Sequence, residues 1–159
     1  MTNKIILVSG PVIVENNKVL LNQHGEDNFW KFCGGRVETQ DFASLLLENC
    51  QREAAEEMGI ELEILDENPF LIYIQKEIAE GKIDIILAHF LANRKGEIKP
   101  GSEIREWCWF DLDKLPKDIA PNVQEALRHF GFWLNKKTLV SRHLVSSEIL
   151  NYNMRNEIT

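Results

Sequence analysis

Apolar positions in the first third of the chain fall in runs typical of β-strands. Residues 4–14 are rich in Ile and Val and are broken at Gly10-Pro11, which predicts a strand with a bend, because proline cannot donate to a ladder. A turn at 15–17 and an apolar run at 18–23 predict the returning strand of a hairpin. The aromatic run 29–32 predicts a further short strand.

The pattern then changes to a helical spacing. One apolar stripe is made by Leu46, Leu47, Cys50, Ala54 and Met58. Asp41 or Ser44 is suited to cap the start of this helix, and Gly59 is suited to stop it after Met58. The stripe predicts that the helix lies on the sheet.

Strands return in the second half of the chain. We expect them over 60–65, 70–75, 83–93 and 107–110, the third being the most apolar and therefore central. Pro121 fits the first position of a second helix, with Val123, Ala126, Leu127 and Phe130 at helical spacing. Strands mixed with helices predict an α/β (α+β) fold.

The chain of 159 residues is the size of one domain. The pattern weakens after residue 133, so we expect a domain over 1–133 and a C-terminal extension over 134–159. Within the extension, 139–154 fits a helix packed on the domain or on a partner subunit, or a partly disordered segment. A homodimer is therefore left open.

Charge and composition narrow the function classes. The net charge of −7 argues against a nucleic-acid or anionic-membrane surface. Three cysteines without Cys-x-x-Cys spacing fit free thiols in a reducing compartment, and the histidines are scattered, so His24 is interpreted as structural. The sequence has no signal-peptide pattern and no apolar run long enough to span a membrane, so a cytoplasmic protein is expected.

The candidate chemistry lies near the end of the first predicted helix. Glu53, Glu56 and Glu57 are spaced i, i+3 and i+4, which puts them on one side of a helix. Like charges at this spacing repel by a few tenths of a kcal/mol per pair. A hard divalent cation would offset that repulsion, and a solvated charged face is the alternative.

The surrounding residues resemble the Nudix hydrolase family, whose box is G-x5-E-x7-R-E-U-x-E-E-x-G-U with U apolar. Residues 52–60, REAAEEMGI, match the second half of the box at every specified position. The approach WKFCGGRVE (30–38) and the downstream WFDLDKLP (109–116) are also similar to the family. The resemblance covers roughly residues 4–130 and implies the Nudix fold, a mixed β-sheet sandwiched between helices.

The first half of the box departs from the family. Counted from Gly35, its acidic position falls on Asp41, and ten residues, rather than seven, separate Asp41 from Arg52. The three extra residues are nearly one helical turn, so they either lengthen the helix or enlarge the preceding loop. In the family this acidic residue helps to hold the arginine, a role for which Asp41 and Glu48 are candidates here.

The resemblance implies Mg²⁺-dependent hydrolysis, with Mn²⁺ as an alternative ion, of a diphosphate linkage in a small nucleoside diphosphate derivative. NDP-sugars, ADP-ribose and NTPs all stay open as substrates. The implied metal ligands are Glu53, Glu56, Glu57 and the Gly34 carbonyl. A catalytic base or an extra metal ligand is expected from Glu103 or Glu106, each of which alternatively is a surface charge.

Supporting roles complete the expectation. Arg36 is a candidate phosphate contact, and the alternative is a solvent-facing strand residue. Trp30 is a candidate for stacking on the nucleobase, and the alternative is a core residue. Arg52 is expected to orient its glutamate neighbours. The alternative function is a non-hydrolysing Nudix-like nucleotide sensor, to which only the displaced Asp41 points.

Overall fold

The computed structural model of the chain describes residues 4–37 and 42–132, which form a mixed sheet and two helices. The strands are β1 (Lys4–Glu15), β2 (Lys18–His24), β3 (Gly35–Arg36), β4 (Glu61–Ile64), β5 (Phe70–Ile78), β6 (Gly81–Lys95) and β7 (Ile104–Asp111). The helices are α1 (Phe42–Met58) and α2 (Pro121–His129). The predicted extension 134–159 lies outside the described residues. None of the described helices is long and apolar enough to cross a bilayer.

The long strands β1 and β6 form the centre of the sheet. The strand order is β4-β6-β1-β2-β7, with β3 also paired to β1 and β5 also paired to β6. β1 and β6 run parallel from the Lys4–Ile83 pair to the Ile13–Ala92 pair, and the remaining pairings are antiparallel. The prediction that residues 83–93 form a central strand is confirmed.

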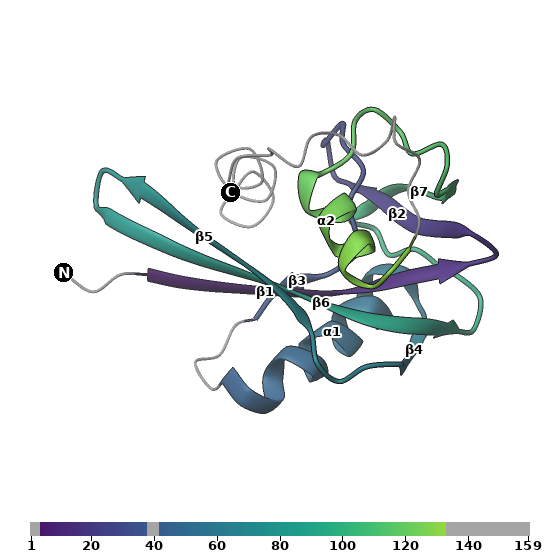
Figure 1. The fold of residues 1–159 in the computed structure, drawn as a ribbon, viewed down its shortest axis with the longest axis horizontal. Coiled ribbons are helices and arrows are strands. Elements are labelled where there is room, and N and C mark those ends of the chain that lie inside the picture. Colours follow the sequence, from purple (N-terminus) through teal and green to yellow (C-terminus); the bar gives the residue numbers. More distant parts are fainter. Residues whose placement is uncertain (1–3, 38–41, 133–159) are drawn as a thin grey trace.

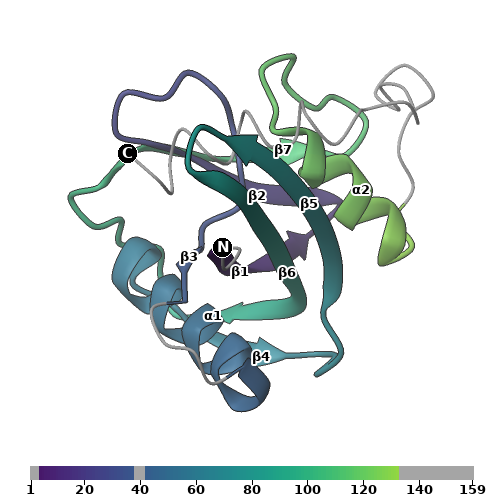
Figure 2. The same cartoon turned by 90° about the vertical axis from the view of Figure 1, so that its left-hand side faces the viewer.

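The two helices cover opposite faces of this sheet (Figures 1 and 2). Successive side chains of a strand point to opposite faces, so Val12 and Leu21 join the cluster beneath α2, whereas Ile13 and Leu20 join the one beneath α1. Both faces are buried here, which explains why these strands read as continuous apolar runs. The α+β class predicted from the sequence is confirmed.

Helix α1 follows the predicted stripe. Cys50, Ala54 and Met58 are fully buried, and Gly59 ends the helix with φ +68°. The Gly59 amide donates to Ala55 and the next amide to Ala54, so two terminal carbonyls find partners. Residues 42–51 are all helical. The extra residues before Arg52 therefore lengthen the helix and do not enlarge a loop after Asp41.

The predicted aromatic strand over 29–32 is wrong. Only Trp30 and Lys31 form ladder contacts, and these are isolated bridges to two different partners, Ile119 and Asn22. The segment crosses between two neighbours without running along one, and its aromatic character reflects burial of Phe29 in the core beneath α2. Strand β7 also begins earlier than predicted, at Ile104.

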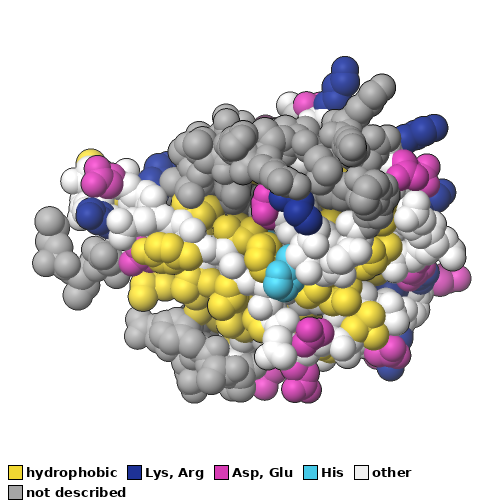
Figure 3. Space-filling view, in the orientation of Figure 1, with side chains coloured by type: hydrophobic (Ala, Val, Ile, Leu, Met, Phe, Trp, Pro, Cys, Tyr) yellow, Lys and Arg dark blue, Asp and Glu magenta, His cyan; other side chains and the backbone are white. Residues whose placement is uncertain are grey.

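The hairpin of β5 and β6 extends past both helices, together with the start of β1 (Figure 1). Figure 3 shows apolar side chains across the face seen in that view, with acidic side chains at several places around them. The large apolar side chains exposed on the described surface include Ile5, Leu71 and Tyr73. The hydroxyl of Tyr73 donates to Asp84 at 2.7 Å across the hairpin.

Candidate active site

The last two turns of α1 place the three box glutamates in different environments. The side chain of Glu57 is 6% exposed, that of Glu53 is 13% exposed and that of Glu56 is 59% exposed. Glu57 borders the apolar stripe, as the helical wheel predicts, whereas Glu56 faces solvent. A buried carboxylate requires a partner, so Glu57 and Glu53 carry the greater demand for compensating charge.

The glycine pair before α1 makes room for these two carboxylates. The amide of Gly34 donates to Glu57 Oε2 at 2.9 Å. Gly34 has φ +144°, and a Cβ there would lie 2.5 Å from the Ser9 carbonyl oxygen. A Cβ on Gly35 would lie 2.5 Å from the carboxyl carbon of Glu53. The backbone at position 35 can approach Glu53 this closely because it has no Cβ, whereas glycine at position 34 is required by its positive φ and by the backbone of β1.

The loop over residues 96–103 brings a fourth carboxylate to the end of α1. The amide of Lys99 donates to the Met58 carbonyl, and the amide of Gly101 donates to the Glu57 carbonyl, both at 2.8 Å. These bonds satisfy terminal carbonyls of the helix and fix the loop against it. Glu103, at the end of this loop, is thereby held beside Glu57. The two are 46 positions apart in the sequence.

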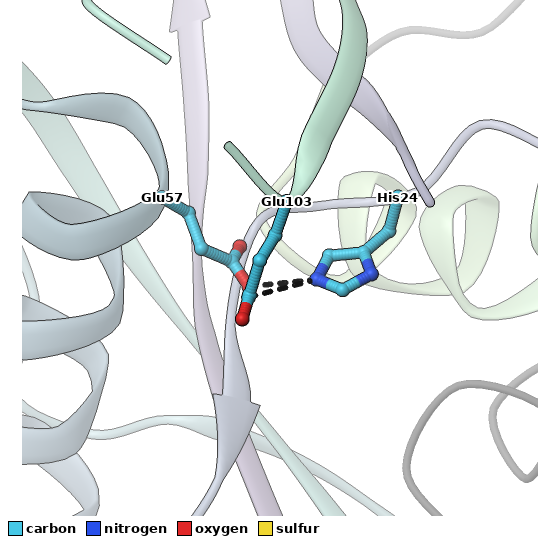
Figure 4. A group of neighbouring side chains, drawn as sticks. All are labelled: His24, Glu57 and Glu103. Carbon is cyan, nitrogen blue, oxygen red and sulfur yellow. Dashed lines mark hydrogen bonds and ion pairs between the residues drawn. The ribbon is translucent and has the colours of Figure 1, made fainter. Parts of the chain in front are cut away.

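His24, at the end of β2, completes a cluster with these two carboxylates (Figure 4). Its Nε2 atom lies 3.2 Å from Glu103 Oε2 and 3.7 Å from Glu57 Oε1. Ligand atoms of all three side chains lie within 4.8 Å of one another. We call His24, Glu57 and Glu103 the His-Glu-Glu cluster.

The site concentrates negative charge around a cavity. A cavity of about 180 Å³ is lined by Glu56, Glu57, Gly101, Ser102 and Glu103. Partial burial raises the pKa of Glu53, and the charges of Glu56 and Glu103 raise it further against the opposing effect of Arg52. A bound cation would relieve this accumulation, and carboxylate oxygens with an imidazole nitrogen are donors that divalent metals accept. The residues present therefore fit a divalent metal ion.

Arg52 links the box to the glycine pair through a residue that the sequence analysis missed. Its guanidinium donates to Glu53 Oε1 and Glu56 Oε2, each at 3.0 Å, and to Asn49. The side-chain NH₂ group of Asn49 in turn donates to Ser9 Oγ at 2.9 Å and to the Gly35 carbonyl at 3.0 Å. A polar residue on the sheet-facing side of the predicted helix was the available signal. The orienting role expected of Arg52 agrees with these contacts, which do not involve Glu48.

The other predicted site residues lie apart from the His-Glu-Glu cluster. Trp30 packs edge-on against Phe110 at 4.7 Å, within the core beneath α2. Arg36 pairs with Val8 in the register, so its side chain lies on the sheet face opposite α1. Glu106 is exposed on β7, outside the cluster.

Asp41 lies outside the described residues. Gly34 contacts Glu57 through its amide, and metal binding by its carbonyl stays a prediction.

The family follows from comparison with known proteins. A model of the NUDIX domain matches residues 7–130, which is most of the chain. The chain belongs to the Nudix family. Comparison of this Nudix chain with curated proteins gives no match.

Solved structures agree with the family. The Nudix chain is similar to a MutT NUDIX hydrolase from Burkholderia pseudomallei, with 25% identity, a TM-score of 0.62 and coverage of 79% of this chain and 98% of that one. A MutT protein from Bacillus halodurans shares 27% identity, with a TM-score of 0.58 and coverage of 79% and 81%. An ADP-ribose pyrophosphatase from Streptococcus suis, at 24% identity and a TM-score of 0.50 over 70% and 77%, shows the fold alone. The chain is thus a Nudix-type pyrophosphohydrolase, as its box predicted.

Proposed function

We propose that this protein hydrolyses a diphosphate linkage in a nucleoside diphosphate derivative with the help of a divalent metal ion. The observation that carries the proposal is the convergence of Glu57 and Glu103 from distant segments beside Glu53, around one cavity. A solvated charged face would not require Gly35 to leave room for a carboxylate. The end of α1 and the loop over 96–103 line the cavity, and the glycine pair contacts Glu57 and closely approaches Glu53.

The proposed roles follow from exposure and contact. Glu57 and Glu53 are the principal ligands because they are the most buried carboxylates of the box, and Glu56 is an additional ligand at the rim of the cavity. Glu103, with a 70% exposed side chain, is the candidate base that accepts a proton from the attacking water or, alternatively, an extra ligand of the ion. When bound, the metal ion would neutralise diphosphate charge and lower the pKa of a bound water.

The substrate is narrowed to a class. Solved structures of this fold to which the chain is similar include an ADP-ribose pyrophosphatase and a UDP-X diphosphatase, whose names describe action on diphosphates of nucleosides. We therefore retain NDP-sugars, ADP-ribose and NTPs as candidates, with Mg²⁺ or Mn²⁺ as the ion. Phosphate contact by Arg36, base contact by Trp30, a base role for Glu106, the homodimer and the cytoplasmic location stay predictions.

The test is hydrolysis of a substrate panel by the full chain with Mg²⁺ or Mn²⁺. Release of monophosphates is followed by chromatography for the wild type, Glu57→Gln and the control Glu48→Gln, an exposed glutamate on the same helix. Glutamine at position 57 retains an oxygen for the Gly34 amide but loses the charge. We expect kcat/KM to fall about 100-fold or more in Glu57→Gln and to stay within twofold in the control.

Two results would contradict the proposal. Turnover that Glu57→Gln leaves unchanged would remove the metal assignment. Tight binding of one nucleotide without turnover of any would favour the sensor. Hydrolysis in ¹⁸O-labelled water then shows which phosphorus the water attacks.

A further inference from the structure

We infer that His24 supplies a nitrogen ligand to the metal ion of this site, which gives the centre a preference for divalent transition-metal ions over Mg²⁺. The inference deepens the proposed function and rests on its metal site. No signal in the box points to this residue. It comes from the distances and the backbone that hold the imidazole.

The separations within the cluster are those of ligands on one ion. Donor atoms at about 2.1 Å from an octahedral ion are about 3.0 Å apart when adjacent and about 4.2 Å apart when opposite. The 3.2 Å from His24 Nε2 to Glu103 Oε2 and the 3.7 Å to Glu57 Oε1 both lie within these limits. One ion can therefore contact all three side chains after small movements.

A β-bulge in β7 brings Glu103 beside His24. Gln23 pairs with Glu106, but His24 pairs with Ile104, so β7 carries one extra residue, Arg105. A bulge of this kind bends the strand and changes the direction of the neighbouring side chains. The bulge brings Ile104, and with it Glu103, opposite His24, which lies on the same face of β2 as Leu20 and faces Glu57 and Glu103 (Figure 4).

The loop after His24 is fixed from the same bulge. The Arg105 guanidinium donates to the carbonyls of Gly25 and Asp27, at 3.1 and 2.7 Å, and to the Gln23 side chain at 2.6 Å. The amide of Gly25 donates to the carbonyl of Glu103 at 2.9 Å. The imidazole and the Glu103 carboxylate are thus attached to backbone segments that are bonded to each other. This preorganisation favours a ligand over a passing surface contact.

The imidazole nitrogen donor determines which divalent ions the site prefers. Mg²⁺ prefers oxygen ligands, whereas imidazole nitrogen suits first-row transition metals. The nitrogen binds through its lone pair, so the imidazole hydrogen resides on Nδ1 in the bound form. A centre with two or more carboxylates and one imidazole binds Mn²⁺ or Co²⁺ better, relative to Mg²⁺, than one with oxygen ligands alone.

The experiment detects the nitrogen directly. Electron spin echo modulation of Mn²⁺ bound to the full chain reports ¹⁴N nuclei in contact with the ion. We expect imidazole ¹⁴N modulation in the wild type, its loss in His24→Gln, and its retention in His129→Gln, an exposed histidine that stacks on Phe70. Calorimetric Mn²⁺ affinity should fall about tenfold in His24→Gln while Mg²⁺ affinity changes less than about twofold.

The outcomes separate the two proposals. Wild-type Mn²⁺ without imidazole modulation, or equal losses of Mn²⁺ and Mg²⁺ affinity in His24→Gln, would overturn the nitrogen ligand and leave the proposed function standing. Mn²⁺ affinity that Glu57→Gln does not reduce would place the ion elsewhere and overturn both. Loss of the modulation in His24→Gln with retention in His129→Gln supports the assignment of His24 as a ligand.

Discussion

Acidification should destabilise this protein through His89, a buried histidine that the proposed chemistry does not use. His89 is 5% exposed, and burial lowers its pKa from 6.5 to about 4. The side-chain amide of Asn122 lies 3.1 Å from Nε2, where its NH₂ group donates to the neutral ring. The charged imidazole would lose solvation and face a donor, so the folded state favours the neutral form.

The sign and size of the effect follow from linkage. A lowered histidine pKa means that the unfolded chain binds the proton first, so stability is complete above pH 6.5 and is lost as pH falls towards 4. The loss is about 0.1 kcal/mol at pH 7.5 and about 1.4 kcal/mol at pH 5.5, approaching about 3.4 kcal/mol below both pKa values. Between pH 7.5 and 5.5 His89 therefore removes about 1.3 kcal/mol of unfolding free energy.

Urea unfolding followed by tryptophan fluorescence measures this difference at the two pH values. Because other groups also titrate, the comparison is with His89→Gln, which cannot take up the proton and retains an acceptor for Asn122. The variant is less stable at pH 7.5 through altered packing, but the gap to the wild type should narrow by about 1.3 kcal/mol at pH 5.5. A gap that stays constant with pH would refute the reasoning.

Two further substitutions test how the fold builds the site. Gly35→Ala places a Cβ against the Glu53 carboxylate, so diphosphate hydrolysis should fall about 100-fold because that group is displaced. The free energy of urea unfolding should change little. Full activity of the variant would contradict the close approach of the backbone to Glu53. Met58→Ala removes a fully buried side chain from the core beneath α1 and should cost about 3 kcal/mol in the same unfolding assay. Leu65→Ala, at a position that is 49% exposed, is the control and should cost less than about 1 kcal/mol, and equal costs would argue against the core assignment.

The helix of the box was the most predictable part of the molecule. Its stripe and its glycine stop are local signals, because i, i+3 and i+4 spacing and a positive φ after the last turn follow from helix geometry. On a helical wheel the stripe is flanked by Glu57, whereas Glu53 lies further round with Glu56, so the low exposure of Glu53 was not predicted. The destination of the extra residues before Arg52 was not predictable, since a loop and a helical turn suit the same three residues equally well.

The aromatic run over 29–32 and the His-Glu-Glu cluster were not predictable from local sequence patterns. Residues 29–32 have strand-like composition because they are buried, and burial does not distinguish a strand from a crossing segment. His24 meets Glu103 only through the pairing of β2 with β7 and the bulge at Arg105. The periodic pattern of apolar residues predicts neither which strand pairs with β2 nor that β7 contains an extra residue. The spatial neighbours of His24 could therefore not be predicted from the sequence around it.

The parallel pairing of β1 with β6 also bears on how the protein acquires its site during folding. Lys4 pairs with Ile83, and His24 contacts Glu103 across a separation of 79 residues. Contacts this distant must close long loops before they contribute stability, which slows folding relative to a chain with local contacts. On a ribosome, α1 can form early, but its glutamates stay without their loop partner until Glu103 has emerged. The His-Glu-Glu cluster is therefore complete only in a chain whose sheet has closed.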